Sequence, residues 1–324
     1  MTDWLSEVKR KGPRRPSQTD VEDLNRLFSD SFTDRYRKDG LVGVCVPQLN
    51  PDIWQYAIKD AGKGAMLWFD EKDEMVAFNM AHHSGLEGWM GPLAVRPDRQ
   101  GSGIGSLIVE AAIDWLRAEG VTTLGLETMP RTVENISFYG KLGFVPQYLT
   151  MTMTREVGDR EPGTQFTRFS ELERKPRESV VERCRESVGD VFSGYDFTRE
   201  FDLSIELDIG DAVVVQTEDK VTGFALWHSA PLAHNRSGDE LRVLKLFADS
   251  QEVFAQVVLA LESCAEKLRL PAVAIRCQTG YEGAYRILTE LGYRVRWTDL
   301  RMTLGGYAEP TVPGEEVLFS NWEI

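Results

Sequence analysis

The clearest pattern in the chain is a helical stripe of apolar residues that follows a run of alternate glycines. In the segment LIVEAAIDWLRAEG (107–120), the apolar positions 107, 108, 111, 112, 115 and 116 fall on one face of a helix. The pattern predicts a helix over 104–118, and Gly120 follows it as a residue suited to end a helix. Short apolar runs before it predict strands at 65–69, 75–81 and 88–95.

The rest of the first half continues this alternation of helices and strands. The expected helices are 19–30, 51–61 and 132–141, and the expected further strands are 122–128 and 145–154. Asn50 is suited to cap the second helix, and Pro51 is suited to its first position. The polar stretch VGDREPGT (157–164) is typical of a linker.

The second half repeats this order of elements. A shift of 149 residues places Leu142-Gly143-Phe144 on Leu291-Gly292-Tyr293, and it places the apolar helical stripe on apolar residues between 257 and 265. We therefore expect two domains, 1–156 and 165–324, joined by 157–164. The tail GEEVLFSNWEI (314–324) is expected to add a strand or to cover a sheet edge, with Phe319 and Trp322 packed.

Composition and charge exclude several classes of function. The chain has 324 residues, of which 42% are hydrophobic, and a formal net charge of -14, which argues against nucleic-acid binding. The charge is compatible with a cationic substrate, but solubility is the favoured explanation. The four cysteines form no CxxC pair and the four histidines complete no zinc pattern, so no metal is expected. No apolar run is as long as the roughly 20 residues that a membrane-spanning helix needs. The N-terminus lacks the apolar region of a signal peptide. We therefore expect a cytoplasmic protein without membrane contact.

The glycine run RQGSGIGS (99–106) is the strongest candidate for a ligand site. Glycine removes side chains where a ligand approaches the backbone, and the free N–H groups of the following helix favour a phosphate. A P-loop would need a lysine after its last glycine, and a dinucleotide fingerprint would need a glycine at Ser106, so both fit poorly. A plain flexible connector is the alternative.

Two segments together resemble the GCN5-related N-acetyltransferase (GNAT) family. They are GPLAVRPDRQGSGIGSLIVEAAIDWL (91–116) and NISFYGKLGF (135–144), and Gln100, Gly103 and Gly105 match the family's loop signature. The resemblance implies an α/β fold with a mixed sheet, here as two tandem acyl-CoA N-acyltransferase (GNAT) folds. It also implies acetyl-CoA as co-substrate. The residues implied to hold it are Leu93, Ala94, Val95, Gln100, Gly101, Ser102, Gly103, Ile104, Gly105 and Ser106.

The resemblance also implies a reaction, the direct transfer of an acetyl group to a primary amine. Tyr139 matches a tyrosine that protonates the departing thiolate in many members; packing over the core is its structural alternative. For the general base we expect Glu127, at the end of a strand beside the cleft, with Glu87, His82 and His83 as weaker candidates. The acceptor, a small molecule or a peptide, and the oligomeric state are left open, and 40–49 is a candidate substrate wall.

The second copy has lost every residue assigned to the co-substrate. Gly101, Gly103 and Gly105 correspond to Ser250, Glu252 and Phe254, while Gln100 becomes Asp249 and Tyr139 becomes Leu288. The sequence therefore predicts one active lobe at the N-terminus and a degenerate second lobe that serves packing or substrate contacts. A non-catalytic acyl-CoA sensor is the alternative function, and the missing fingerprint makes a dinucleotide-dependent oxidoreductase improbable.

Overall fold

A computed structural model describes residues 12–158, 165–218, 220–311 and 314–323 of the chain. In the first lobe the elements are α2 (Val21–Lys38), α3 (Pro51–Ala61), β1 (Ala65–Phe69), β2 (Met75–Ser84), β3 (Glu87–Val95), α4 (Ile104–Ala118), β4 (Thr123–Thr128), α5 (Val133–Lys141) and β5 (Phe144–Glu156). In the second lobe they are β6 (Thr167–Arg168), α6 (Arg174–Val191), α7 (Thr198–Glu206), β7 (Gly210–Gln216), β8 (Val221–His228), β9 (Leu241–Ala248), α8 (Gln251–Lys267), β10 (Ala272–Gln278), α9 (Glu282–Glu290), β11 (Arg294–Leu304) and β12 (Val317–Ser320). Short 3-10 turns, such as Pro97–Arg99, connect some of them.

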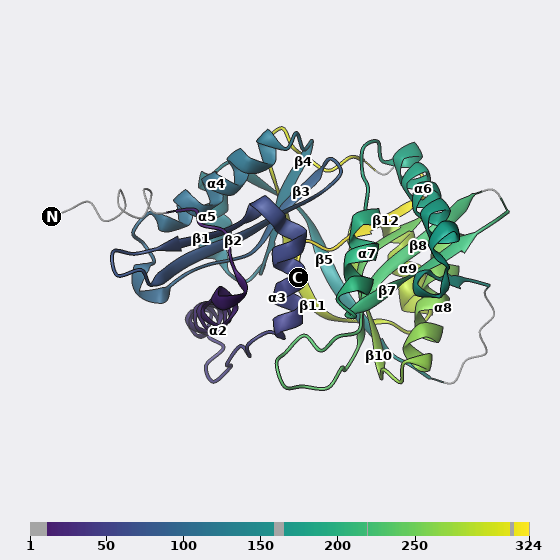
Figure 1. Ribbon diagram of the computed structural model, residues 1–324, viewed down its shortest axis with the longest axis horizontal. Coiled ribbons are helices and arrows are strands. Elements are labelled where there is room, and N and C mark those ends of the chain that lie inside the picture. Colours follow the sequence, from purple (N-terminus) through teal and green to yellow (C-terminus); the bar gives the residue numbers. More distant parts are fainter. Residues whose placement is uncertain (1–11, 159–164, 219, 312–313, 324) are drawn as a thin grey trace.

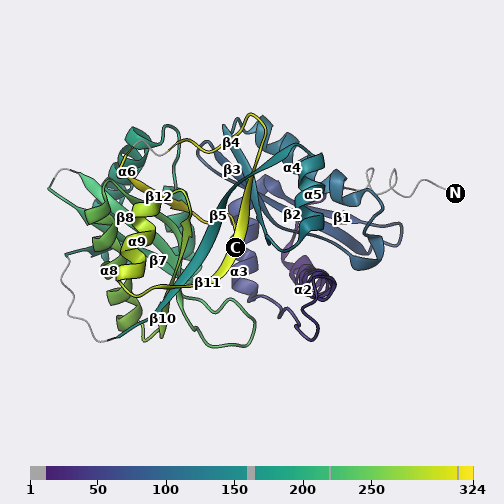
Figure 2. The ribbon, with the colours of Figure 1, turned by 180° about the vertical axis from the view of Figure 1, so that it is seen from behind.

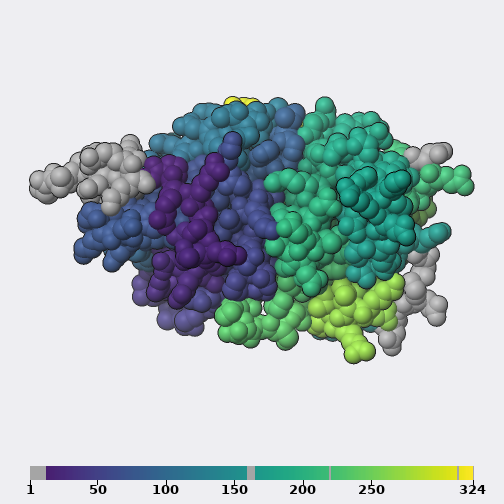
Figure 3. Space-filling view, in the orientation of Figure 1, coloured from purple at the N-terminus to yellow at the C-terminus, as the bar shows by residue number. Residues whose placement is uncertain are grey.

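The predicted repeat is confirmed in space. α5 and α9 begin and end 149 residues apart, and each is followed by a long strand. The predicted cap is also present, because the Asn50 side chain accepts a hydrogen bond from the Asp52 amide at 3.1 Å, and Pro51 opens α3. Figures 1 and 3 show the two lobes packed side by side, the first in purple to blue and the second mainly in green.

One mixed sheet runs through both lobes. Its order is β1-β2-β3-β4-β11-β5-β10-β9-β8-β7-β6, and β12 pairs with β9. The lobes therefore exchange strands: β11 lies between β4 and β5, and β5 lies between β11 and β10. Figure 2 shows β5 in teal and β11 in yellow side by side at the junction. This exchange was not predicted, and the proposed division at 157–164 stays a prediction, since 159–164 lie outside the described residues.

Each lobe has one apolar core on each face of the sheet. Alternate residues of β1 show why: Met66 and Trp68 join the core under α4, whereas Ala65, Leu67 and Phe69 join the core under α2 and α3. In the second lobe α8 and α9 cover one face, and α6 and α7 cover the other (Figure 1). The sheet is thus covered on both sides over most of its length.

Several elements are longer than their apolar patterns predict, and in two of them buried polar residues explain the difference. The helix expected at 19–30 continues to Lys38, and within this extension Ser31 is buried and donates a hydrogen bond to the Val95 carbonyl at 3.2 Å. The strand expected at 75–81 continues to Ser84, because His82 is buried against Asp60 and Ser84 against Glu200. A buried polar residue with a hydrogen-bond partner looks like a surface residue to a hydropathy pattern.

Candidate active site

The site begins where two parallel strands of the first lobe diverge. β3 and β4 pair only at Glu87–Thr123, Gly88–Leu124 and Trp89–Gly125. Beyond Trp89, β3 keeps its partner β2 on one side, but the described residues place no strand along its other edge. The predicted Leu93, Ala94 and Val95 lie in this stretch, so their backbone borders the opening of the fork.

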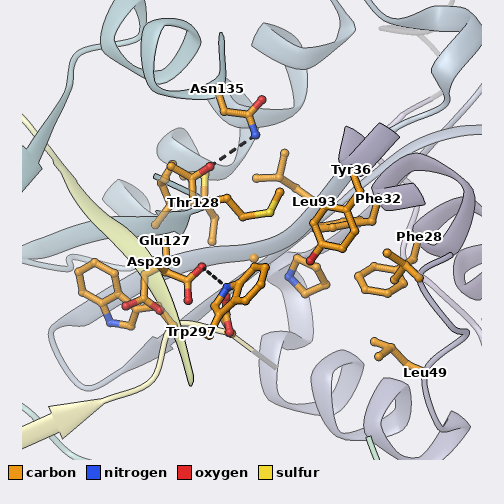
Figure 4. Close-up of a pocket in the computed structure, with 18 of the residues that line it drawn as sticks. Phe28, Phe32, Tyr36, Leu49, Leu93, Glu127, Thr128, Asn135, Trp297 and Asp299 are labelled. Carbon is orange, nitrogen blue, oxygen red and sulfur yellow. Dashed lines mark hydrogen bonds between the residues drawn. The ribbon is translucent and has the colours of Figure 1, made fainter. Parts of the chain in front are cut away.

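A cavity of about 360 Å³ opens from this fork. Both lobes contribute to its wall (Figure 4), and its lining includes Phe28, Phe32, Tyr36, Val46, Pro47, Leu49, Leu93, Glu127, Asn135, Tyr139, Leu232, Trp297, Asp299, Trp322 and Glu323. Val46, Pro47 and Leu49 come from the segment 40–49 that the sequence singled out as a substrate wall. At one end of the cavity, the side-chain amide of Asn135 donates a hydrogen bond to the Thr128 hydroxyl at 3.4 Å.

The glycine run leads from the fork into α4 without a side-chain cap. Gly101 and Gly103 have φ of +77° and +92°, a left-handed conformation that favours glycine, and Gly103 is the N-cap of α4. No side chain of the described residues caps this helix, so the first-turn amides of Ile104, Gly105 and Ser106 present positive partial charge. An anion would bind favourably at this position.

The other residues of the run have contacts of their own. The Gln100 side chain accepts a hydrogen bond from Lys38 at 2.8 Å and donates one to the Val95 carbonyl at 3.3 Å, and the Ser102 hydroxyl donates to the Arg99 carbonyl. A side chain at Gly105 would come within 3.2 Å of the Phe138 ring. Packing therefore also explains a glycine at position 105, because it lets α4 approach α5. The assignment of these residues to acetyl-CoA stays a prediction.

Tyr139 lies on α5 and is 6% exposed, with its remaining surface on the cavity. Its ring contacts the rings of Phe138 and Phe144, with centroids 5.1 Å and 6.0 Å away. Burial raises the pKa of its hydroxyl, which therefore keeps its proton at neutral pH. The group can donate a hydrogen bond into the cavity but cannot serve as a base.

Glu127 lies where the sequence predicted, on β4 beside the cavity, but its carboxylate is already occupied. It accepts hydrogen bonds from Arg276 at 2.8 Å, from Arg301 at 3.0 Å and from Thr150. Burial would raise the pKa of the Glu127 carboxyl, but the two guanidinium groups outweigh this effect and hold the pKa below its ordinary value. The geometry makes Glu127 an anchor for two arginines, and its role as base stays a prediction.

The weaker base candidates do not line the cavity, and each already has a structural partner. Glu87 is fully buried and accepts hydrogen bonds from Trp322 at 2.9 Å and from Ser320 at 2.7 Å. The His82 ring contacts Asp60 at 2.6 Å and the Gly91 carbonyl at 3.2 Å. His83 faces the Gly85 carbonyl at 3.4 Å.

Two carboxyl groups on the cavity wall were missed by the sequence analysis. Asp299 on β11 is 1% exposed, and its oxygens accept hydrogen bonds from Trp297 at 3.3 Å and from Arg276 at 3.1 Å. Burial raises the pKa of Asp299 to about 6, Arg276 opposes the shift, and Glu127 adds to it. Figure 4 shows Trp297 and Asp299 together on one side of the cavity. No sequence signal identifies Asp299, because only the strand exchange brings β11 to the first lobe.

Glu323 reaches the same wall from the C-terminal tail. Its carboxylate accepts a hydrogen bond from Arg276 at 2.7 Å, while 45% of its side chain stays exposed. Partial burial raises the pKa of Glu323 against the pull of Arg276, and the neighbouring Asp299 and Glu127 add to the rise. Glu323 therefore combines an accessible carboxyl group with a pKa raised to about 8.

The tail places Glu323 there because Trp322 packs at the base of the fork, beside the last paired residues of β3 and β4. The Trp322 ring lies against Gly125, where a side chain would come within 2.1 Å of it, and the Arg301 guanidinium stacks on the ring at 3.3 Å. The expectation that Trp322 and Phe319 are packed is confirmed, since they are 1% and 2% exposed.

The same fork exists in the second lobe, but the chain itself fills it. β9 and β10 pair only at Leu241–Val273 and Arg242–Ala274, and β12 then takes the edge of β9 over Lys245–Ala248. The helix that follows is capped, because the Ser250 hydroxyl accepts a hydrogen bond from the Val253 amide at 3.3 Å. Leu288 is fully buried at the position that corresponds to Tyr139.

Comparison with known proteins agrees with this repeated architecture. Residues 21–144 match the model of the acetyltransferase (GNAT) family. The first lobe therefore carries a GNAT-family domain. Over 72 residues it is 38% identical to the [ribosomal protein bS18]-alanine N-acetyltransferase of Salmonella typhimurium, a match that covers 22% of this chain and about half (49%) of that GNAT relative.

Solved structures show the GNAT fold over the whole chain. A Pyrococcus horikoshii protein provisionally described as an acetyltransferase has a TM-score of 0.67 at 17% identity and covers 95% of this chain and 94% of its own. A tandem GNAT protein from the clavulanic acid biosynthesis pathway has a TM-score of 0.59 at 12% identity and covers 90% and 96%. The predicted fold class, two tandem GNAT folds, is confirmed.

Two further features bear on the kind of site. Across the residues that the model describes, no group of three or more His, Cys, Asp or Glu side chains is arranged to hold a metal ion. In the same residues, none of the helices has the length and apolar character needed to cross a membrane.

Proposed function

We propose that the first lobe transfers an acyl group, acetyl in the simplest case, from acyl-CoA to a primary amine, and that the second lobe helps to bind the amine. The observation that carries this proposal is the contrast between the two forks. In the first lobe the fork is open and the helix N-terminus beside it is uncapped. In the second lobe β12 fills the fork and Ser250 caps the helix.

The open fork suits the chemistry of acyl-CoA. A pantetheine arm carries amides that can pair with the free edge of β3, as a strand would. A pyrophosphate suits the uncapped start of α4, where the backbone is bare at Gly101 and Gly103. A hollow of about 300 Å³ on the outer face of α5, lined in part by Phe138 and Lys141, leaves room for the rest of the nucleotide.

The thioester supplies an activated acyl carbon, and residues of this chain move the protons. We assign Glu323, in place of the predicted Glu127, as the group that takes a proton from the acceptor ammonium, since its pKa is raised to about 8 and its side chain is accessible. The neutral nitrogen then forms an amide bond to the acyl carbon while the carbon–sulfur bond breaks. The Tyr139 hydroxyl stabilises the departing thiolate and donates its proton to it late in the reaction. The nitrogen then loses its second proton, which restores the Tyr139 hydroxyl. The proton on Glu323 leaves to solvent.

The function is tested by mixing the protein with acetyl-CoA and a panel of primary amines, then measuring free thiol and product mass. We expect amine-dependent release of CoA with an acetylated product of equal amount. Binding of acetyl-CoA without transfer to any amine would instead support a sensor, and absence of binding would contradict the proposal.

The role of Glu323 has a sharper test. Glu323→Gln should lower kcat at pH 7 by about 100-fold, the usual contribution of a general base, without changing the affinity for acetyl-CoA. The loss should shrink at high pH, because an amine that is already neutral needs no base. In the wild type, kcat should rise with pH as the carboxyl loses its proton. Glu315→Gln, the same change at an exposed position of the same tail, should leave activity unchanged. A Glu323→Gln rate equal to the wild type would remove Glu323 from the mechanism.

A further inference from the structure

Aromatic side chains of both lobes line the cavity between α2 and β11. We call this part of the cavity the acceptor end. Phe28 and Phe32 of α2 lie with ring centroids 4.5 Å apart, and Tyr36 of the same helix faces Trp297 of β11 at 6.5 Å. Trp297 is 40% exposed, although it lines a concave surface. A large aromatic side chain exposed in a cavity is suited to an apolar ligand surface.

The far side of this end is closed by paired backbone. The long loop between β8 and β9, drawn in green below α3 in Figure 1, crosses to the first lobe. There the Asn50 amide donates to the Leu232 carbonyl at 2.9 Å, and the His234 amide donates to the Gln48 carbonyl at 2.9 Å. Leu49 and Ala233 form an antiparallel bridge between these bonds. A peptide chain that left the cavity on this side would have to break both hydrogen bonds, so the closure favours a small acceptor.

The polar side of the same end carries more negative than positive charge. The single Arg276 guanidinium donates to Glu127, Asp299 and Glu323 at 2.8 Å, 3.1 Å and 2.7 Å. Arg301, the other cation at Glu127, also donates twice to Glu309, at 2.8 Å and 2.9 Å. Asp299 and Glu323 therefore share one guanidinium with a third carboxylate, and both border the cavity. A buried carboxylate is stable when a cation is nearby, and an ammonium group supplies one.

We infer that the acceptor is a small primary amine with an aromatic body, such as an arylalkylamine. Its ammonium group lies beside Asp299 and Glu323, and its ring lies against Trp297 and the α2 aromatics. This inference rests on the proposed function and adds the class of acceptor to it. Trp297 is then a specificity residue that the second lobe supplies to the first.

The test compares four acceptors with acetyl-CoA as donor: phenethylamine, n-butylamine, spermidine and a pentapeptide with N-terminal alanine. We expect kcat/KM to be at least about 10-fold higher for phenethylamine than for any other, since only its aromatic ring is buried against Trp297 and the α2 aromatics. A higher kcat/KM for the peptide or for spermidine would overturn the inference while leaving acyl transfer in place. Binding of acetyl-CoA with no transfer to any of the four would overturn both.

Trp297→Ala tests the aromatic wall itself. It should raise KM for phenethylamine about 10-fold and change KM for n-butylamine less than about 2-fold. Val295→Ala, at an exposed position of the same strand outside the cavity lining, is the matched control. Phe32→Ala removes the facing wall from the first lobe and should reduce the same preference if Trp297→Ala fails to fold. An aromatic preference that survives both substitutions would overturn the inference.

Discussion

The two forks of the sheet are formed by equivalent strands, but a cavity lies in the first and a strand lies in the second. In the first lobe β3 and β4 separate after Trp89 and leave a cavity, whereas in the second lobe β9 and β10 separate after Arg242 and receive β12. The helix beside the first fork starts uncapped at Gly103, and the helix beside the second is capped by Ser250. The second lobe keeps the fold without equivalents of Gly101 and Gly103, so we propose that a ligand accounts for these two glycines, whereas Gly105 also packs against Phe138.

The comparison also shows what the second lobe contributes. Its strand β11 and its tail cross to the first lobe and bring Trp297, Asp299 and Glu323 to the cavity. The second lobe, whose own fork is filled, thus supplies part of the cavity wall of its neighbour.

The first prediction tests whether β12 fills the second fork, and it uses the substitution Phe319→Ala. Phe319 of β12 packs against the rings of Phe254 and Tyr281 at 5.5 Å and 5.3 Å and is 2% exposed. Its removal leaves a cavity, so the free energy of unfolding should fall by about 3–5 kcal/mol, as measured by urea denaturation. Tyr285→Ala, which removes a more exposed ring from α9, should cost less than about 1 kcal/mol. Equal effects of the two substitutions would show that β12 does not fill a core.

The second prediction makes the first fork resemble the second. Gly103→Glu introduces the residue found at the corresponding position, Glu252, into a φ of +92° and beside the start of α4. Backbone strain and the added charge should weaken acetyl-CoA binding by about 100-fold, measured by calorimetry. Gly120→Glu places the same side chain at a φ of +80° at the other end of α4, in open space, and should leave binding unchanged. Equal binding by wild type and Gly103→Glu would refute the phosphate site.

Tyr139 distinguishes the forks chemically, because Leu288 replaces it in the second. Tyr139→Phe keeps the buried ring and removes only the hydroxyl, so stability should change little. We expect kcat to fall about 10-fold, the effect of losing one stabilising hydrogen bond, with little change in acetyl-CoA affinity. Steady-state kinetics measure both quantities, and an unchanged kcat would limit Tyr139 to packing.

The smallest effect concerns the cap of the second helix. Ser250→Ala removes the hydroxyl that accepts a hydrogen bond from the Val253 amide, and it should lower the free energy of unfolding by about 1 kcal/mol. Acetyl-CoA binding to the first lobe should be unaffected, since the second fork is filled. Acquisition of a second acetyl-CoA site in this variant would contradict the comparison.

The sequence predicted the fold well because periodicity and repetition are local signals. The strand 65–69 and the helices 51–61 and 104–118 have the predicted bounds. The extension of α2 to Lys38 was missed because it buries Ser31 and Asp34, which a hydropathy pattern assigns to the surface.

The site was predicted only in part, because half of it depends on long-range strand pairing. Tyr139 and Glu127 line the cavity as expected, but Glu127 is committed to two arginines that come from β10 and β11. Asp299 and Glu323 enter through the strand exchange and the tail, which no local pattern reveals. The order of strands across two lobes is a tertiary property, so the acceptor half of the site was beyond the sequence.

The number of acetyl-CoA molecules bound per chain tests the central claim most directly. Calorimetric titration of the wild-type protein with acetyl-CoA should give one site per chain, because the first fork is open and β12 fills the second. Two sites per chain would show that the second fork opens to ligand, and no binding would show that the first fork is not a CoA site; either result would contradict the account.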